Sequence, residues 1–402
     1  MSLPAGLRSL RHRDYRIYLS GLVLSQVGRW MQTVAQSWLV LELTRSPFQL
    51  GLIATLQFTP MLLFSVFSGA VVDRLPKRRL LVFTKSVSAG QSFLLAALVW
   101  SGHVQYWHIA GLALLLGLIN TLDNTTRQSY VSELVPREDV GNAVALSSAG
   151  FNSARIVGPA IAGLLIAQLG IAPAIMVNGA SFIFVIGALL LVRERPDPRP
   201  ARTTTLLEEV REGLVYAMST PRIRLALGVL FVVSLFVFNF NVYVPLLARE
   251  VLHQEADGFG FLMASVGVGA VSGALALGIV AHSRPTMPLA FAACLIACAG
   301  IFGMSWVDAF WAGALALFVT GFFSVVVTAT CNTMLQLTAP DALRGRVMSL
   351  YTLVFGGTVP FGAFMVGLIS EHWSVPIAFL AMGSAGLVGT AALFAGWRLR
   401  PR

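Results

Sequence analysis

Two arginines and one aspartate lie deep inside apolar stretches of this sequence, where an uncompensated charge is costly. They are Arg29, Arg155 and Asp123. An arginine at the centre of a membrane-spanning helix costs roughly 2.5–3.5 kcal/mol on insertion scales, so it should face water, a partner or a ligand. We expect Arg29 and Arg155 to bind an acidic group of a small molecule or to tune a nearby carboxylate. The alternative is an ion pair between neighbouring helices, in which Asp123 is the partner of Arg127 rather than of either arginine.

Two carboxylates are placed to take up and release a proton. Asp123 lies within an apolar stretch, and Glu42 lies at the outer end of the first stretch. A carboxylate that changes partners inside a membrane can relay a proton. We predict both as candidates for proton coupling. The alternative for Asp123 is a structural ion pair that latches the two halves in the closed state. The alternative for Glu42 is an exposed helix end that only contacts solvent.

Neutral polar residues recur at helical spacing along several apolar stretches. Asn239 and Tyr243, for example, share one helical face, and Asn241 is turned away from it. Polar groups inside a membrane are candidates for a binding site, although interhelical hydrogen bonds of about 0.6 kcal/mol each are the alternative. The predicted substrate-binding residues are Arg29, Gln32, Gln36, Asn120, Asn124, Arg155, Asn239, Tyr243, Asn332 and Gln336.

The sequence lacks the motifs of ATP hydrolysis and of zinc-dependent catalysis. The sequence has no Gly-x-x-x-x-Gly-Lys-Ser/Thr loop for ATP and no His-Glu-x-x-His zinc site. Its cysteines, Cys294, Cys298 and Cys331, lie in apolar runs and are predicted to be small buried side chains. We therefore expect no enzyme activity, no metal and no cofactor, with a proton gradient as the energy source.

The composition indicates which elements carry these residues. Of the 402 residues, 56% are hydrophobic and 11% are charged, whereas soluble domains have about 45–50% and about 25%. A membrane-crossing helix needs about 20 mainly apolar residues, and twelve such runs occur. They are residues 15–42, 49–72, 80–100, 107–128, 142–168, 172–192, 223–248, 259–281, 287–306, 309–337, 343–369 and 374–397. The sequence predicts an all-α membrane protein without room for a separate soluble catalytic domain.

The basic residues predict the orientation. Most of them, Lys85 included, fall near span ends on the side of the two termini, whereas Arg45 and Arg249 are the ones on the other side. Cytoplasmic loops carry the excess of Lys and Arg, so both termini are predicted to be cytoplasmic. The net charge of +10 is then a signal of topology and not of nucleic-acid binding.

The two halves of the chain resemble each other at a displacement of about 204–209 residues. Gly51 matches Gly260, and Gly163 matches Gly367. Two six-helix bundles repeated in the same orientation are related by a pseudo-two-fold axis along the membrane normal, with a substrate site between them near mid-membrane. The predicted domains are the first bundle (1–193), a cytoplasmic linker with an amphipathic helix (194–222) and the second bundle (223–402).

The segment Gly69-Ala-Val-Val-Asp73-Arg74-Leu-Pro-Lys77-Arg78-Arg79 resembles the signature loop of the major facilitator superfamily, with Pro76 where that family usually has glycine. The resemblance implies a latch between the halves. It implies that Asp73 faces the start of span 11 and that Lys77 pairs with an acid at the cytoplasmic end of span 4, for which Asp123 is the matching residue. The alternative is that these basic residues only set the topology.

The fifth span resembles the antiporter motif of the same superfamily around Gly158-Pro159. The predicted gating residues are Gly69, Asp73, Arg74, Lys77, Arg78, Gly158 and Pro159. Strings such as His12-Arg-Asp-Tyr-Arg16 resemble the branch of bacterial exporters that includes the enterobactin exporter and macrolide-efflux proteins.

The resemblance implies a secondary transporter of the bacterial inner membrane. We expect a monomeric, proton-coupled exporter of small amphipathic compounds such as drugs or siderophores, whose partners are its cargo and the lipid bilayer. An importer or facilitator of a small, possibly anionic, metabolite on the same fold is the alternative. A lipid scramblase or a membrane-embedded enzyme is a further alternative. The enzyme would need His and Asp, or Cys and His, converging at one membrane face, and the sequence does not show such a group.

Overall fold

A computed structural model describes residues 5–193, 214–280 and 286–398. For residues 5, 65–70, 73, 74, 280, 341 and 342 it describes the backbone only. Within these ranges, eleven helical segments are long and apolar enough to cross a membrane. The first long helix, α1 (Arg13–Thr44), is the twelfth crossing; its many amide and hydroxyl side chains lower its hydropathy. The all-α architecture predicted from the twelve apolar runs is confirmed.

The first bundle contains six long helices that pack on one another. A short 3-10 helix, η1 (Ala5–Arg11), precedes α1, and another, η2 (Arg137–Asp139), precedes α5. After α1 come α2 (Pro47–Arg74), α3 (Lys77–Trp100), α4 (Tyr106–Leu134), α5 (Val140–Leu169) and α6 (Ile171–Leu191). Below, the side of the membrane where α1 begins is called the terminal side, and the opposite side is called the far side.

The second bundle repeats this pattern. Its helices are α8 (Pro221–Phe236), α9 (Phe240–Leu246), the π-helix η3 (Leu247–Val251), α10 (Ala256–Val280), α11 (Met287–Gly303), the 3-10 helix η4 (Met304–Trp306), α12 (Phe310–Thr338), α13 (Asp341–His372) and α14 (Val375–Arg398). Residues 214–219 of the predicted linker are helical. The rest of the predicted amphipathic helix lies outside the described residues, and the domain boundaries stay a prediction.

The seventh span is not the continuous helix that its apolar run predicts. It breaks between Phe236 and Phe240, and two polar side chains satisfy carbonyl groups that the break leaves free. Asn239 Nδ2 donates to the carbonyl of Leu235 at 2.8 Å, and the Tyr243 hydroxyl donates to the carbonyl of Phe236 at 2.7 Å. In a membrane, backbone groups at a helix break need such internal partners.

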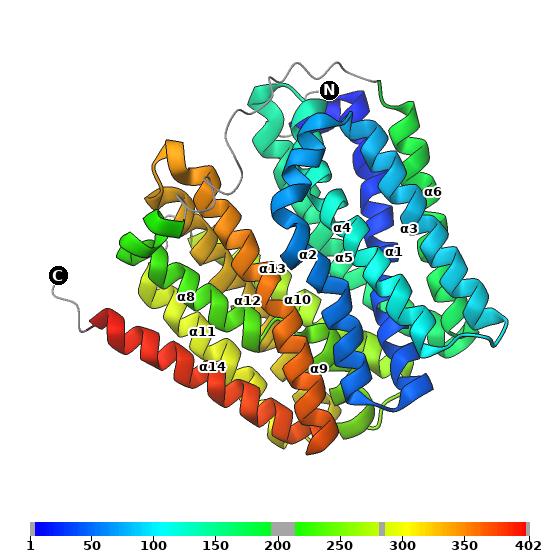
Figure 1. Ribbon diagram of the computed structural model, residues 1–402, viewed down its shortest axis with the longest axis vertical. Coiled ribbons are helices and arrows are strands. Elements are labelled where there is room, and N and C mark those ends of the chain that lie inside the picture. The colour runs from blue at the N-terminus through cyan, green and yellow to red at the C-terminus, as the bar shows by residue number, and fades with distance from the viewer. Residues whose placement is uncertain (1–4, 194–213, 281–285, 399–402) are drawn as a thin grey trace.

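Glycines bring the two bundles into contact near the far side. A Cβ on Gly51 of α2 would lie 3.0 Å from Gly367 Cα of α13, and one on Gly163 of α5 would lie 2.9 Å from Gly260 Cα of α10. These are the pairs that the internal repeat matches, Gly51 with Gly260 and Gly163 with Gly367, now exchanged between the bundles. Figure 1 shows α2 and α13 running side by side along the boundary. The contacts confirm the pseudo-two-fold relation.

Candidate functional site

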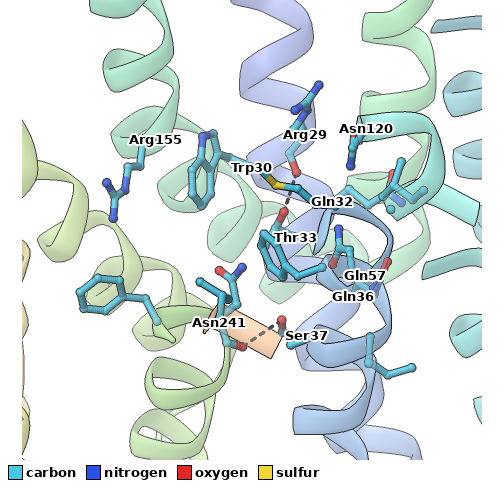
Figure 2. Close-up of a pocket in the computed structure, with 18 of the residues that line it drawn as sticks. Arg29, Trp30, Gln32, Thr33, Gln36, Ser37, Gln57, Asn120, Arg155 and Asn241 are labelled. Carbon is cyan, nitrogen blue, oxygen red and sulfur yellow. Dashed lines mark hydrogen bonds between the residues drawn. The ribbon is translucent and has the colours of Figure 1, made fainter. Parts of the chain in front are cut away.

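A cavity of about 340 Å³ lies at mid-depth between the two bundles. Helices α1, α2, α4, α5 and α6 line it from the first bundle. From the second bundle it is lined by α9 and the break that precedes it, by α10 and by α13. Six of the ten predicted substrate-binding residues lie in its wall: Arg29, Gln32, Gln36, Asn120, Asn124 and Arg155. Several phenylalanines complete the lining (Figure 2). This size and mixture of apolar and polar groups suit a small organic molecule.

The cavity is closed toward the far side by contacts between the bundles. The Trp38 ring of α1 stacks on Phe259 of α10 with their centroids 5.6 Å apart, and Arg249 lies over the same indole at 5.5 Å. In the cavity wall beside these rings, Ser37 Oγ donates to the carbonyl of Asn241 at 3.4 Å (Figure 2). Trp38 is therefore a residue of the far-side closure.

A carboxylate from the second bundle strengthens this closure. Glu371 of α13 accepts hydrogen bonds from Ser46 Oγ at 2.8 Å and from the backbone N–H of Phe48 at 3.2 Å. Ser46 is the N-cap of α2, and its hydroxyl also accepts a hydrogen bond from the backbone N–H of Gln49. An anion at a helix N-terminus is stabilised by the exposed N–H groups. Opening the far side would have to separate these groups.

Asp123 is the centre of a buried charge cluster at the edge of the cavity. Its Oδ2 accepts from Lys85 Nζ at 2.8 Å and from Arg29 Nη2 at 3.2 Å, and its Oδ1 accepts from Thr84 Oγ1 at 3.0 Å. Asp123 and Lys85 are each 2% exposed. The expectation that Asp123 pairs with Arg127 was wrong; Arg127 donates to Asn124 at 3.2 Å instead.

Lys85 was also misplaced by the sequence reasoning, which grouped it with the basic residues of the terminal-side loop. It lies two turns inside α3, where its ammonium reaches Asp123 and lies 5.6 Å from the Phe182 ring. A lysine near the start of an apolar run looks like a topology signal in sequence. The helix, however, begins at Lys77 and turns Lys85 toward the bundle interior.

The acid that pairs with Lys77 is Glu133, not Asp123. Lys77 is the first residue of α3 and Glu133 lies in the last turn of α4, so the pair joins the terminal-side ends of two helices in one bundle. Arg78 donates from Nε to the carbonyl of Leu189 at 2.7 Å, at the end of α6. The side chains of Asp73 and Arg74 are not described, and Gly69 is described by its backbone alone, so the predicted gating roles of these three residues stay predictions.

Gly158 and Pro159 lie where α5 crosses two other helices. A Cβ on Gly158 would lie 2.6 Å from Trp30 Cβ of α1, and the carbonyl of Pro159 lies against Gly260 of α10. The predicted antiporter motif therefore makes two close helix contacts. One is with α1 within the first bundle, and the other is with α10 across the boundary between the bundles. Its role in gating stays a prediction.

The two arginines of the cavity differ in their partners. Arg29 shares Asp123 with Lys85. Arg155 makes no ion pair or hydrogen bond with its side chain to any described residue; its Cζ lies 5.7 Å from the ring of Trp30 and 5.9 Å from that of Phe240. Figure 2 shows Trp30 between the two arginines. The sequence predicted both as cavity residues but could not distinguish them.

Gln32 combines two of the roles predicted for polar residues. It borders the cavity, yet it is 2% exposed and holds three helices together. Its Nε2 donates to Gln91 Oε1 at 3.0 Å, and its Oε1 accepts from Ser92 Oγ at 2.6 Å and from Asn178 Nδ2 at 2.5 Å. Gln32 is therefore chiefly an interhelical hydrogen-bonding residue.

Four predicted substrate-binding residues are not among those that line the cavity. Asn239 and Tyr243 are buried at the helix break, which also turns Asn241, predicted to face away, into the cavity wall. Asn332 accepts from Gln336 Nε2 at 2.6 Å, near the terminal-side end of α12. Glu42, the second proton-coupling candidate, is exposed at the far end of α1.

Gln57 of α2 and Asn178 of α6 line the cavity but were not predicted. Each carries its amide inside an apolar run, the signal that had selected Asn120. Applying the same rule to every span would have found both. For Asn241 no such signal existed, because its orientation depends on the break in the helix.

Comparison with known proteins agrees with this geometry. A family model described as transmembrane secretion effector, within the major facilitator superfamily, matches residues 5–402. The chain belongs to this family. It is 28% identical over 387 residues to the enterobactin exporter EntS of Shigella flexneri, covering 94% of this chain and 90% of that one. It is 26% identical over 388 residues to the multidrug efflux pump Tap of Mycolicibacterium fortuitum, covering 94% of each.

The chain is also 23% identical to the staphyloferrin A transporter of Staphylococcus aureus (strain NCTC 8325 / PS 47), and the match covers 94% of this chain and 95% of that one. Among solved structures, the nucleoside transporter NupG superimposes with a TM-score of 0.76 at 11% identity, over 96% of this chain and all of that one. A bacterial homologue of the lysosomal transporter Spinster, in an inward-facing and occupied conformation, gives 0.74 at 13% identity over 97% of each chain. These structures support the fold.

Proposed function

We propose that this protein is a proton-coupled exporter that moves small amphipathic organic compounds across the bacterial cytoplasmic membrane by alternating access. The supporting observation is the central cavity between two bundles that meet at Gly51–Gly367 and Gly163–Gly260 on the far side. A rocking motion about such contacts would open the cavity to one side at a time. With both termini in the cytoplasm, the far side is the outer side, and the structure is then closed to the outside.

The cavity wall favours an amphipathic cargo. Phe58, Phe151 and Phe355 offer an apolar surface, whereas Gln36, Asn120 and other amides offer hydrogen bonds. Relatives of this family include proteins named for the export of a siderophore and for the efflux of drugs. Compounds of these classes are therefore the proposed cargo, carried by a monomer.

The charge cluster at Asp123 is the proposed site of proton coupling. Arg29 and Lys85 give this cluster two positive charges against one carboxylate, and guanidinium groups do not release protons. Arg29 also lines the cavity, so the apolar part of an amphipathic cargo would displace water from the cluster. Because loss of water disfavours charge, the cargo-bound form would hold one proton fewer, which is what exchange of cargo for a proton requires.

Transport into inside-out membrane vesicles tests the proposal. An acidic vesicle interior should drive accumulation of a fluorescent cargo probe, with ethidium and 8-anilinonaphthalene-1-sulfonate as the cationic and anionic probes. A protonophore should abolish the accumulation, and vesicles without the protein provide the background. Accumulation that is unaffected by the proton gradient would remove proton coupling. Accumulation that requires an alkaline interior would favour the importer.

A further inference from the structure

Arg155 is a charged group for which the described part of the chain provides no counter-ion. Its guanidinium lies in the cavity wall between two aromatic rings, Trp30 of α1 and Phe240 of α9, at 5.7 and 5.9 Å from their centroids. The two rings come from different bundles. Cation–π contacts of this kind orient the guanidinium, but they do not neutralise its charge.

Two other arginines of the first bundle have polar partners. Arg29 meets Asp123 at 3.2 Å, and Arg78 donates to the carbonyls of Leu189 and Leu190. Among the residues that the structure describes, no carboxylate forms an ion pair with Arg155 and no carbonyl accepts from its side chain. An arginine at this depth is costly unless water or an anion offsets its charge.

The aromatic contacts also determine how a ligand could approach. The rings of Trp30 and Phe240 lie near the guanidinium carbon but offer no hydrogen-bond acceptor, so the N–H edge of Arg155 has no acceptor among the described residues. That edge is the part of arginine that binds carboxylates and sulfonates through two parallel hydrogen bonds. The site therefore suits a planar or tetrahedral anion attached to an apolar body, and the phenylalanines of the cavity would contact that body.

We propose that the cargo is an organic anion and that Arg155 binds its anionic group, while Arg29 stays with Asp123. This inference rests on the proposed transport function and specifies its substrate class. It also separates two tasks that the sequence assigned jointly to both arginines. Trp30 stands between the two sites (Figure 2), so an anion at Arg155 does not need to approach the cluster that would exchange the proton.

The inference can be tested with two dyes that share one aromatic framework. 8-Anilinonaphthalene-1-sulfonate carries a sulfonate, and N-phenyl-1-naphthylamine lacks it. The affinity of the purified protein in detergent is measured for both by fluorescence titration, with empty micelles as the background. Charge-assisted hydrogen bonds contribute about 1.5–3 kcal/mol, which is about a tenfold to hundredfold preference for the sulfonate dye.

Arg155→Gln should remove this preference and leave the affinity for the uncharged dye unchanged. Arg155→Lys, which keeps the charge but not the two-pronged geometry, should retain part of it and guards against a general loss of folding. Arg222→Gln is the matched control, because Arg222 is exposed at the start of α8 and its change removes one positive charge outside the cavity.

Three outcomes are decisive. A preference lost in Arg155→Gln and kept in Arg222→Gln supports the assignment. A preference lost in Arg29→Gln but kept in Arg155→Gln, or equal affinities of the native protein for the two dyes, overturns it. If the dyes bind equally while proton-driven uptake of ethidium persists, the anion assignment fails and the transport function stands; if no probe is taken up, the transport function itself fails.

Discussion

Removing the carboxylate of Asp123 should destabilise the protein far more than removing either of its cationic partners. Asp123→Asn leaves Lys85 and Arg29 facing each other across a neutral amide, in a place where Asp123 and Lys85 are 2% exposed. Breaking a buried ion pair by deleting one partner costs about 3–5 kcal/mol, since a charge is left uncompensated. Here two charges lose their partner, so the upper end of that range is expected.

Lys85→Met should cost much less. It leaves the Arg29–Asp123 pair intact and removes the surplus positive charge, so the loss is about one charge-assisted hydrogen bond, roughly 1.5–3 kcal/mol, partly offset by the better burial of methionine. The double variant Asp123→Asn, Lys85→Met should be more stable than Asp123→Asn alone. Unfolding free energies from denaturant titration in mixed micelles test this order. If Lys85→Met costs as much as Asp123→Asn, or if the double variant shows the sum of the two losses, the cluster is not held by the shared carboxylate.

Three further changes probe the closure and the helix break. Gly163→Val places a side chain where even a Cβ would lie 2.8 Å from the α10 backbone, so the far side should stay open and a cysteine placed at Asn241 should react faster with an impermeant maleimide added to that side. Glu371→Gln removes the anion at the start of α2 and should shift the closed-to-open ratio by about twofold to fivefold, measured by spin-label distances across the far side. Tyr243→Phe frees the carbonyl of Phe236 and should cost about 1 kcal/mol in the same denaturant titration.

The helical spans and their arrangement could be predicted because both depend on properties that persist along the chain. Long apolar runs mark the helices, and the recurrence of glycines marks the repeat. Gly51 and Gly260 occupy matching positions, and each meets the partner bundle at Gly367 and Gly163. A two-fold relation places the four glycines of the two sequence matches in two equivalent contacts, so the repeat was predictable, although the contacts themselves were not predicted.

The identity of ion-pair partners was less predictable, because it depends on where a helix ends. The predicted fourth span stopped at residue 128, whereas α4 continues to Leu134 and carries Glu133 in its last turn. At about 1.5 Å per residue, Glu133 and Asp123 differ by about 15 Å along the helix axis. An error of six residues in one helix end therefore assigned the partner of Lys77 to an acid that lies deep inside the bundle.

The broken seventh span was not predictable from hydropathy, because a break does not alter the apolar character of a run. Helical spacing placed Asn239 and Tyr243 on the cavity face, whereas both satisfy the carbonyls of the break. Asn241 and Phe240 then reach the cavity from a short helix that follows the break. The residues that the seventh span presents to the cavity are thus determined by a local departure from the periodicity on which the prediction relied.

The distribution of charge between the bundles suggests how movement and chemistry are divided. Arg29, Lys85 and Asp123 come from α1, α3 and α4 of the first bundle, so a rigid rotation of the bundles leaves their contacts unchanged. Arg155 belongs to the same bundle, but one of its two aromatic contacts, Phe240, belongs to the other. A rocking motion must therefore alter the surroundings of Arg155 while it preserves the cluster. On this basis the proposed anion site would sense which side is open, and the proposed coupling cluster would respond to whether the cavity is filled.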